Sequence, residues 1–240
     1  MGWTGYRADH YTKAGAVDRK AECDAYFMEG LNRGHFFVEK STMVGSTYYA
    51  AVRTLKRGVL DENGKHKKDA DGRYLYEDIP EGEQKVWAAV FLTSTEKADG
   101  CNFFYKNMDE TVGPCQYDCP ESILKLLSPT DNEYAKEWRN KCLLHTQAQK
   151  IIKDCPIGTV LEFHTGSGET MSIRKRMAAY QFKKPWWYCD EKDCYIRPAQ
   201  IPDNFLVNGE KWQVKPLENA STVFEEQMEQ MTLDLEEEER

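Results

Sequence analysis

Hydrophobic residues near the start of the chain recur at spacings of three and four. Cys23, Tyr26, Phe27 and Leu31 would lie near one face of a helix with this period. The pattern therefore predicts a helix over residues 16–31.

The segments that follow are rich in aromatic and β-branched residues, a composition typical of β-strands. Gly45 separates the first two of them and marks a turn or a bulge. The predicted strands cover residues 36–40, 47–55, 85–95 and 101–106.

A polar extension lies between the second and third of these strands. It contains two strong turn signals, Asn63-Gly64 and Asp71-Gly72, whose residues tolerate the positive φ of tight hairpin turns. The extension is predicted to be a protruding β-hairpin that ends in Tyr74, Leu75 and Tyr76.

The middle of the chain carries helix-start signals. Pro120 suits the first position of a helix, because the N–H that proline lacks would be unpaired there. Thr130 and Glu133 form the capping-box pattern of a longer helix, which should end before Pro156. The residues expected on the apolar stripe of that longer helix are Tyr134, Trp138 and Cys142.

From Ile157 onward the period of the hydrophobic pattern changes to two, as in strands. Turn signals at residues 165–168, at 190–193 and at Asn208-Gly209 divide this region into short segments. Short strands at such spacing predict a small barrel, SH3-like in size. The predicted strands cover residues 160–164, 170–174, 180–189, 194–197, 205–207 and 211–214.

These patterns together predict an α+β protein in three parts. Residues 1–155 form an N-terminal antiparallel sheet with helices, residues 156–217 form the small SH3-like all-β module, and residues 218–240 form an acidic C-terminal helix. This last helix opens with a second capping box, Thr222 and Glu225.

The acidic charge is concentrated in the last part. Residues 218–240 hold nine acidic residues and one arginine, which equals the net charge of −8 of the whole chain, so the other 217 residues are neutral overall. The acidic tail could mimic phosphates, fold back on the basic stretch 174–184, or remain a solvated helix.

The composition favours a cytoplasmic protein that does not enter a membrane. The chain has no apolar run long enough for a bilayer and no secretory signal at its start. Its eight cysteines are spread over a long chain, which favours free thiols or a metal site over disulfides. No cofactor motif is present.

The stretch from Met171 to Cys189 combines basic and aromatic residues and lacks acidic ones. Cations that pair with phosphates, beside rings that stack on bases, are typical of single-stranded nucleic-acid binding. The alternative is an ordinary strand with rings in the core and charges in solvent. The candidate binding residues are Arg174, Lys175, Arg176, Lys183, Lys184, Trp186 and Trp187.

A second candidate site is a reactive thiol. Cys119 precedes the predicted helix start, where the helix dipole would favour a thiolate. Cys115, Asp118 and His10 could complete such an enzyme site. The alternative is that Cys119 is simply a small residue before a helix.

The cysteines also allow a metal hypothesis. Cys189 and Cys194 face each other across a four-residue turn, and with Cys115 and Cys119 they would supply the four thiolates of a structural zinc site.

Several runs of residues resemble a domain family of unknown function encoded on plasmids, phages and integrative conjugative elements of Gram-positive bacteria. The resemblance covers residues 1 to about 208 and excludes the acidic tail. The runs that carry it are 1–6 (MGWTGY), 17–23 (VDRKAEC), 40–51 (KSTMVGSTYYAA) and 109–115 (DETVGPC). It implies a mobile-element setting, in which accessory proteins handle DNA transfer or blunt host defences such as restriction and CRISPR nucleases.

Three functional hypotheses follow. The first is a non-enzymatic counter-defence inhibitor, of the anti-CRISPR or anti-restriction type, that binds a host nuclease or its nucleic acid. The second is a factor in DNA transfer that binds DNA or RNA through the basic-aromatic stretch. The third is a cysteine-based enzyme.

Overall fold

The computed structural model describes residues 2–177 and 185–217. It contains helices and antiparallel sheets, so the predicted α+β class is confirmed. The chain divides into two compact units: of the described residues, 2–139 and Leu217 belong to the first, and 140–216 to the second. Long helix α3 (Glu133–Asp154) contributes to both, whereas the sequence-based division at residue 155 assigned it to one.

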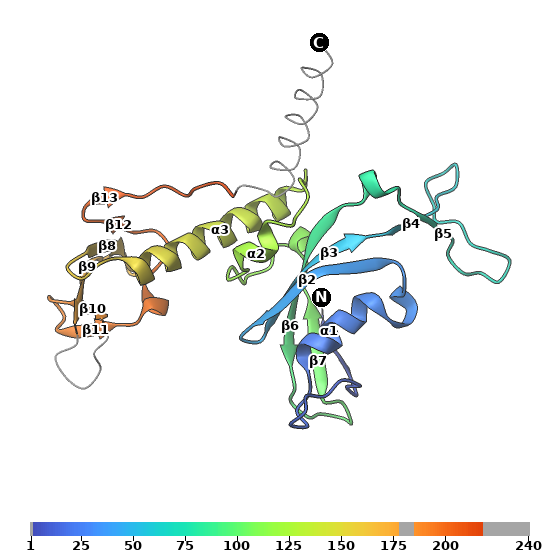
Figure 1. The fold of residues 1–240 in the computed structure, drawn as a ribbon, viewed down its shortest axis with the longest axis horizontal. Coiled ribbons are helices and arrows are strands. Elements are labelled where there is room, and N and C mark those ends of the chain that lie inside the picture. The colour runs from blue at the N-terminus through green and yellow to red at the C-terminus, as the bar shows by residue number, and fades with distance from the viewer. Residues whose placement is uncertain (1, 178–184, 218–240) are drawn as a thin grey trace, which may run out of the picture. The chain divides into compact units, whose positions relative to one another are not determined.

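The first unit is built on a five-stranded antiparallel sheet (Figure 1). Strands β2 and β3 are joined by a tight turn at Gly45, whose φ of 58° explains the glycine. The four predicted strands are confirmed, and a short N-terminal strand joins them. The strand order is β1 (Thr4–Tyr6), β7 (Phe103–Asn107), β6 (Val86–Ser94), β3 (Thr47–Thr54) and β2 (Phe36–Val44).

Helix α1 (Arg19–Met28) covers one face of this sheet. It starts where the Asp18 side chain accepts a hydrogen bond from the N–H of Ala21, as an N-cap does. Cys23 and Phe27 are buried in the core between helix and sheet. The predicted helix is therefore confirmed but shorter, since Leu31 lies beyond it in the 3-10 turn η1 (Gly30–Asn32) and is 98% exposed.

The opposite face of the sheet is covered by the segment after β7. This segment contains the 3-10 turn η3 (Glu110–Val112), the single-turn helix α2 (Glu121–Leu124) and the start of α3. The ring of Trp138 stacks on Tyr49 with centroids 6.5 Å apart. Because both faces are covered, residues 47–52 of β3 are all buried.

Two predicted helix starts are wrong in detail. The N–H of Ala135 donates to the side chain of Asn132, so Asn132 rather than Thr130 caps α3. Tyr134 is exposed, while Trp138 and Cys142 are buried as expected. Pro120 is the N-cap of α2 and not its first helical residue.

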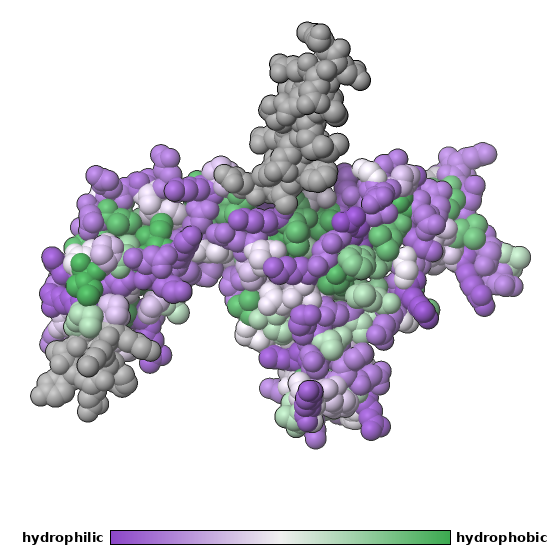
Figure 2. Space-filling view, in the orientation of Figure 1, coloured by the Kyte–Doolittle hydropathy of each residue, from purple (hydrophilic) through white to green (hydrophobic). Residues whose placement is uncertain are grey.

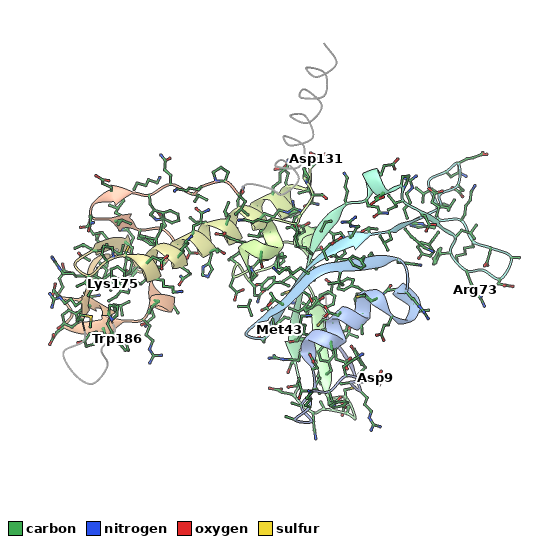
Figure 3. The ribbon with its side chains drawn as sticks, viewed as in Figure 1. Asp9, Met43, Arg73, Asp131, Lys175 and Trp186 are labelled. Carbon is green, nitrogen blue, oxygen red and sulfur yellow. The ribbon has the colours of Figure 1, made fainter. Side chains whose placement is uncertain are left out.

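The predicted extension is an arm of two successive hairpins that follow β4 (Lys56–Gly58) and lead into β5 (Tyr76–Asp78) (Figures 1 and 3). In each turn an aspartate, Asp61 or Asp69, accepts hydrogen bonds from two backbone N–H groups, and a glycine follows with positive φ. The 3-10 turn η2 (Glu81–Glu83) then leads back to the sheet.

The arm is held together by a closed ring of backbone hydrogen bonds. Val59 donates to Leu75, Leu75 donates to Lys67, and Lys67 donates to Val59, at 2.8–3.0 Å. Figure 2 shows the arm as mainly hydrophilic with small hydrophobic areas. Because so little apolar surface is available there, this backbone ring gives the arm its order.

The second unit is a six-stranded antiparallel sheet covered by the C-terminal half of α3. Ala148 and Ile152 of the helix pack against Leu161, Ile173 and Trp187. The strand order is β11 (Cys194–Ile196), β10 (Pro185–Cys189), β9 (Thr170–Met177), β8 (Val160–His164), β12 (Leu206–Val207) and β13 (Glu210–Lys211), and the 3-10 turn η4 (Pro198–Gln200) follows β11. The predicted strands are confirmed here, except that residues 180–184 and the capping box of the tail lie outside the described residues and that β13 is shorter.

The first unit should depend strongly on a buried ion pair. Both carboxylate oxygens of Glu110 accept from the guanidinium of Arg139, at 2.6 and 2.7 Å, and Glu110 is 2% exposed. Glu110→Gln leaves the arginine without its counter-charge, so we expect a loss of about 3 kcal/mol in the free energy of unfolding, measured with urea.

Glu133→Gln is the matched control, because Glu133 pairs with Lys136 on the exposed surface of α3, the helix that also carries Arg139. We expect its effect to stay below about 0.5 kcal/mol. Equal effects of the two variants would contradict the importance of the buried pair.

Candidate nucleic-acid interface

The basic-aromatic stretch is divided by the alternation of strands β9 and β10. Successive side chains on a strand point to opposite faces. Lys175 and Trp187, which are register partners, are 5% and 2% exposed and point into the core. Arg174 and Arg176 on β9, with Trp186 on β10, occupy the opposite, outer face.

Lys175 is a structural residue, which corrects its predicted role in binding. Its ammonium group donates to the carbonyl oxygens of Ile152 and Lys153 at 3.2 and 2.6 Å, and it lies 5.4 Å from the ring centroid of Trp187. These carbonyls belong to the last turn of helix α3, where the helix dipole is negative. The lysine thus caps α3 and also satisfies its own buried charge.

The outer face carries a cluster of aromatic rings. Tyr195 lies in T-shaped contact with both Trp186 and Tyr188, with centroids 5.7 and 5.1 Å apart. Tyr195 is 50% exposed. The guanidinium of Arg176 lies 4.8 Å from the ring centroid of Tyr188, and Arg174 is the register partner of that tyrosine. The outer face of β9–β11 is therefore formed by Arg174, Arg176, Trp186, Tyr188 and Tyr195.

Acidic side chains at the β10–β11 turn fix this arrangement. Arg176 pairs with Asp190, and the hydroxyl of Tyr188 donates to Asp193. The hydrogen bond to Asp193 is the main cause that raises the pKa of Tyr188 to about 12. Two of the five residues are thus held in place, whereas Arg174 is exposed and its guanidinium has no ion-pair partner among the described residues.

The charge of the second unit suits an anionic partner. Residues 140–216 contain twelve Lys and Arg and eight Asp and Glu, a net charge of +4. Residues 1–139 contain nineteen basic and twenty-three acidic residues, a net charge of −4. The 217 residues outside the tail, which are neutral overall, are therefore divided between two units of opposite net charge.

A pocket of about 420 Å³ lies between β8 and the segment 204–211 of the same sheet. It is lined by Glu162, His164 and Lys211 together with Thr170, whose hydroxyl lies 3.2 Å from Nδ1 of His164. Phe163, Phe205 and Leu206 also line this pocket, so its lining is mixed, and the opposite charges of Glu162 and Lys211 do not favour a ligand of either charge.

The residues of the predicted thiol site are placed separately. Cys119 is fully buried and Cys115 is exposed, while Asp118 accepts a hydrogen bond from Tyr49. The four-residue α2 has too few aligned peptide units to supply the dipole expected at Cys119.

His10 lies with the elements on the other side of the sheet. Its Nδ1 is 3.3 Å from the buried carboxylate of Glu22 on α1, which also accepts from the backbone N–H groups of Asp9 and His10. The hydroxyl of Tyr6 donates to the same carboxylate. Burial, together with this hydrogen bond, raises the pKa of Tyr6 well above its ordinary value. Glu22 thus anchors the N-terminal segment on α1, and His10 is not brought to Cys115, Asp118 or Cys119.

The two cysteine pairs of the predicted zinc site belong to different units. Cys189 and Cys194 are register partners on β10 and β11, as predicted. All eight cysteines are described, and none of them forms a disulfide. Within residues 2–177 and 185–217, no group of three or more His, Cys, Asp or Glu side chains is arranged to hold a metal ion.

Two members of the outer face were not among the candidate binding residues. Tyr188 and Tyr195 become neighbours through the pairing of β10 with β11. The signal for this pairing was present, because joining Cys189 to Cys194 across the turn places Tyr188 opposite Tyr195. Of the other candidates, Lys183 and Lys184 lie outside the described residues.

Fold and site together define a two-unit α+β protein with a basic, aromatic sheet face. None of the helices described in the structure combines the length and apolar character needed to cross a membrane. In comparisons with protein-family models, curated proteins and solved structures, nothing matches this chain.

The neighbouring residues Lys175 and Arg174 provide a matched test of their opposite orientations. Lys175→Met leaves helix-end carbonyls without their donor, so we expect the second unit to lose about 1–3 kcal/mol of unfolding free energy. Arg174→Met should change it by less than about 0.5 kcal/mol. Urea unfolding of both variants measures this, and a larger effect at Arg174 would contradict the placement.

The hydrogen bond from Tyr188 can be tested by titration. In Asp193→Asn the pKa of Tyr188 should fall from about 12 toward its ordinary value of about 10. Because the pKa is raised in the folded state, the associated stability is present below pH 10 and is lost as the pH rises through 12. NMR of ¹³C-labelled tyrosine follows this titration, and an unchanged pKa in the variant would contradict the assigned cause.

Proposed function

We propose that this chain is a non-enzymatic nucleic-acid-binding accessory protein, and that its second unit binds a single strand through the outer face of β9–β11. The observation that carries the proposal is the placement of three rings and two arginines on one sheet face, within a unit of net charge +4.

The chemistry of single-stranded nucleic acid fits this face. Its phosphates pair with arginines, and its unpaired bases stack on aromatic rings regardless of sequence. Tyr195 is half exposed and Arg174 is exposed, so both can be reached by a ligand. Asp190 and Asp193 orient Arg176 and Tyr188, which reduces the side-chain entropy that binding would remove.

The sequence resemblance suggests the biological setting of this binding. For a protein of a mobile element in the cytoplasm, we infer a counter-defence role in which the face engages the nucleic acid of a host defence nuclease complex. A role in DNA transfer would use the same face. The order of short antiparallel strands supports, as part of this proposal, an SH3-like barrel for the second unit.

A cysteine-based enzyme is the weaker alternative. Cys119 is buried, and His10 is held by Glu22 on the other side of the sheet. The observations therefore favour binding over thiol chemistry.

Binding can be measured by fluorescence anisotropy with a labelled oligothymidylate at 50–200 mM salt. Arg174→Gln should weaken binding and reduce the slope of log affinity against log salt by about 0.7, as expected for one lost phosphate contact. Trp186→Ala and Tyr195→Ala should each weaken binding by about ten-fold at every salt concentration, because each removes a stacking ring.

Lys150→Gln is the matched charge control, since Lys150 is exposed on α3 and belongs to the same unit. A chain shortened after residue 217 tests whether the acidic segment 218–240 competes for the face, in which case its removal should strengthen binding. No binding by either form at 50 mM salt, or an equal loss in Lys150→Gln and Arg174→Gln, would overturn the proposal.

A further inference from the structure

The N-terminal run Gly2-Trp3-Thr4-Gly5-Tyr6 has a structural role that explains only part of its sequence. Its last three residues form strand β1, in which Gly5 is the register partner of Phe104. The ring of Phe104 lies over Gly5 so closely that a Cβ on Gly5 would be 2.3 Å from Cε1 of the ring. Only glycine allows the ring to lie there, whereas the side chain of Trp3 is 51% exposed.

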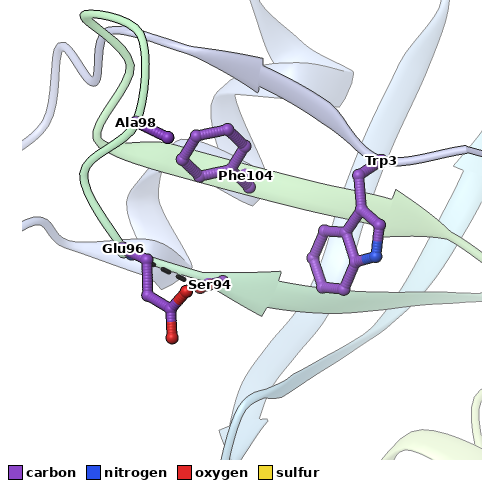
Figure 4. A pocket seen from close by; sticks show the side chains of 5 residues that line it. All are labelled: Trp3, Ser94, Glu96, Ala98 and Phe104. Carbon is purple, nitrogen blue, oxygen red and sulfur yellow. Dashed lines mark hydrogen bonds between the residues drawn. The ribbon is translucent and has the colours of Figure 1, made fainter.

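Trp3 and Phe104 line a pocket of about 250 Å³ on the first unit (Figure 4). The other lining residues are Ser94, Glu96 and Ala98 from the end of β6 and the loop that follows it. The hydroxyl of Ser94 accepts a hydrogen bond from the N–H of Glu96 at 3.3 Å, which ties the start of this loop to the strand. In Figure 4 the side chains of Trp3, Phe104 and Glu96 surround the pocket from different sides.

The lining of this pocket selects the ligand by its charge. Two aromatic rings attract a cation through their negative faces, and indole is the strongest of the natural rings in this respect. Among the described residues that line the pocket, Glu96 is the one with a charged side chain, and its charge is negative. Residues 1–139 as a whole carry a net charge of −4, so an anion is disfavoured.

The size of the pocket and the chemistry of its lining restrict the kind of cation that it can bind. At about 250 Å³ the pocket is smaller than the roughly 300–1,000 Å³ typical of sites for drug-sized molecules. A strongly hydrated inorganic cation would gain little from ring faces and one exposed carboxylate, whereas an alkylated ammonium group presents apolar methyl groups to the rings and keeps its charge.

We propose that this pocket binds a quaternary ammonium group, which stacks on Phe104 and Trp3 and is neutralised by Glu96. The group comes from a free small amine or from a trimethylated lysine side chain, which share this chemistry. The site is distinct from the nucleic-acid interface and lies in the other unit, so its test is independent of that proposal.

The experiment uses the ¹⁵N-labelled full chain and follows the indole N–H resonance of Trp3, assigned as the one that is lost in Trp3→Phe. The probes are choline and its neutral isostere 3,3-dimethylbutan-1-ol. We expect choline to shift the resonance in a saturable way and the isostere to bind at least about ten-fold more weakly, because it lacks the charge that the rings attract.

Glu96→Gln keeps the shape of the pocket and should weaken choline binding about three-fold, as expected for one exposed charge pair. Glu62→Gln is its matched control, with the same charge change at an exposed turn of the arm. A peptide with one trimethyllysine distinguishes the two sources, since binding ten-fold tighter than choline assigns the site to a protein side chain, and equal binding assigns it to a free amine.

Equal binding of choline and the neutral isostere would overturn the proposal. The proposal would also be overturned if neither choline nor the peptide shifted the resonance. An equal effect of Glu96→Gln and Glu62→Gln on choline binding would overturn it as well.

Discussion

Strand β3 is buried on both faces, so its adjacent residues Tyr48 and Tyr49 point into two different layers. Both rings are fully buried, and each hydroxyl must find a polar partner there. Tyr48 donates to Asp24 on α1, whereas Tyr49 donates to Asp118 in the segment before α2. One strand thus fixes the two layers of the first unit. On one side, the carboxylate of Glu22 then holds the N-terminal segment on α1. On the other side, the Glu110–Arg139 ion pair holds η3 against α3.

The second unit uses the same alternation for a different purpose. Lys175 points inward and caps the end of α3, so the helix and the sheet are held in register by a charge rather than by packing alone. Its neighbours Arg174 and Arg176 consequently point outward beside the rings of β10 and β11. A shift of one residue in the register of β9 would exchange its inward-pointing and outward-pointing side chains. The burial of Lys175 therefore also determines that Arg174 and Arg176 are the cations available to a ligand.

Local patterns predicted most of the fold but only part of the site. Strands, turns and helix positions follow from periodicity and from residues such as Gly45, whose conformation few other residues adopt. The cap at Asn132 was missed because Thr130 and Glu133 imitate the same motif. The contact of Tyr188 with Tyr195 followed from the predicted turn between Cys189 and Cys194 but was not drawn from it, whereas the inward direction of Lys175 depends on the end of α3, which local patterns do not encode. The pocket at Trp3 likewise requires β1 to lie beside β7, although the two segments are about a hundred residues apart in the sequence.

The separation of charge connects these features. The first unit has a net charge of −4 and the second a net charge of +4, and the nucleic-acid partner that we propose, being a polyanion, matches the second unit alone. Under the two proposals, the pocket at Trp3 takes a cation and the outer face of β9–β11 takes a polyanion. Aromatic rings contribute to both proposed sites, since a ring can stack on a base and can also attract a cation. The two proposed ligands differ in charge because the groups beside the rings differ, Glu96 in one case and Arg174 with Arg176 in the other.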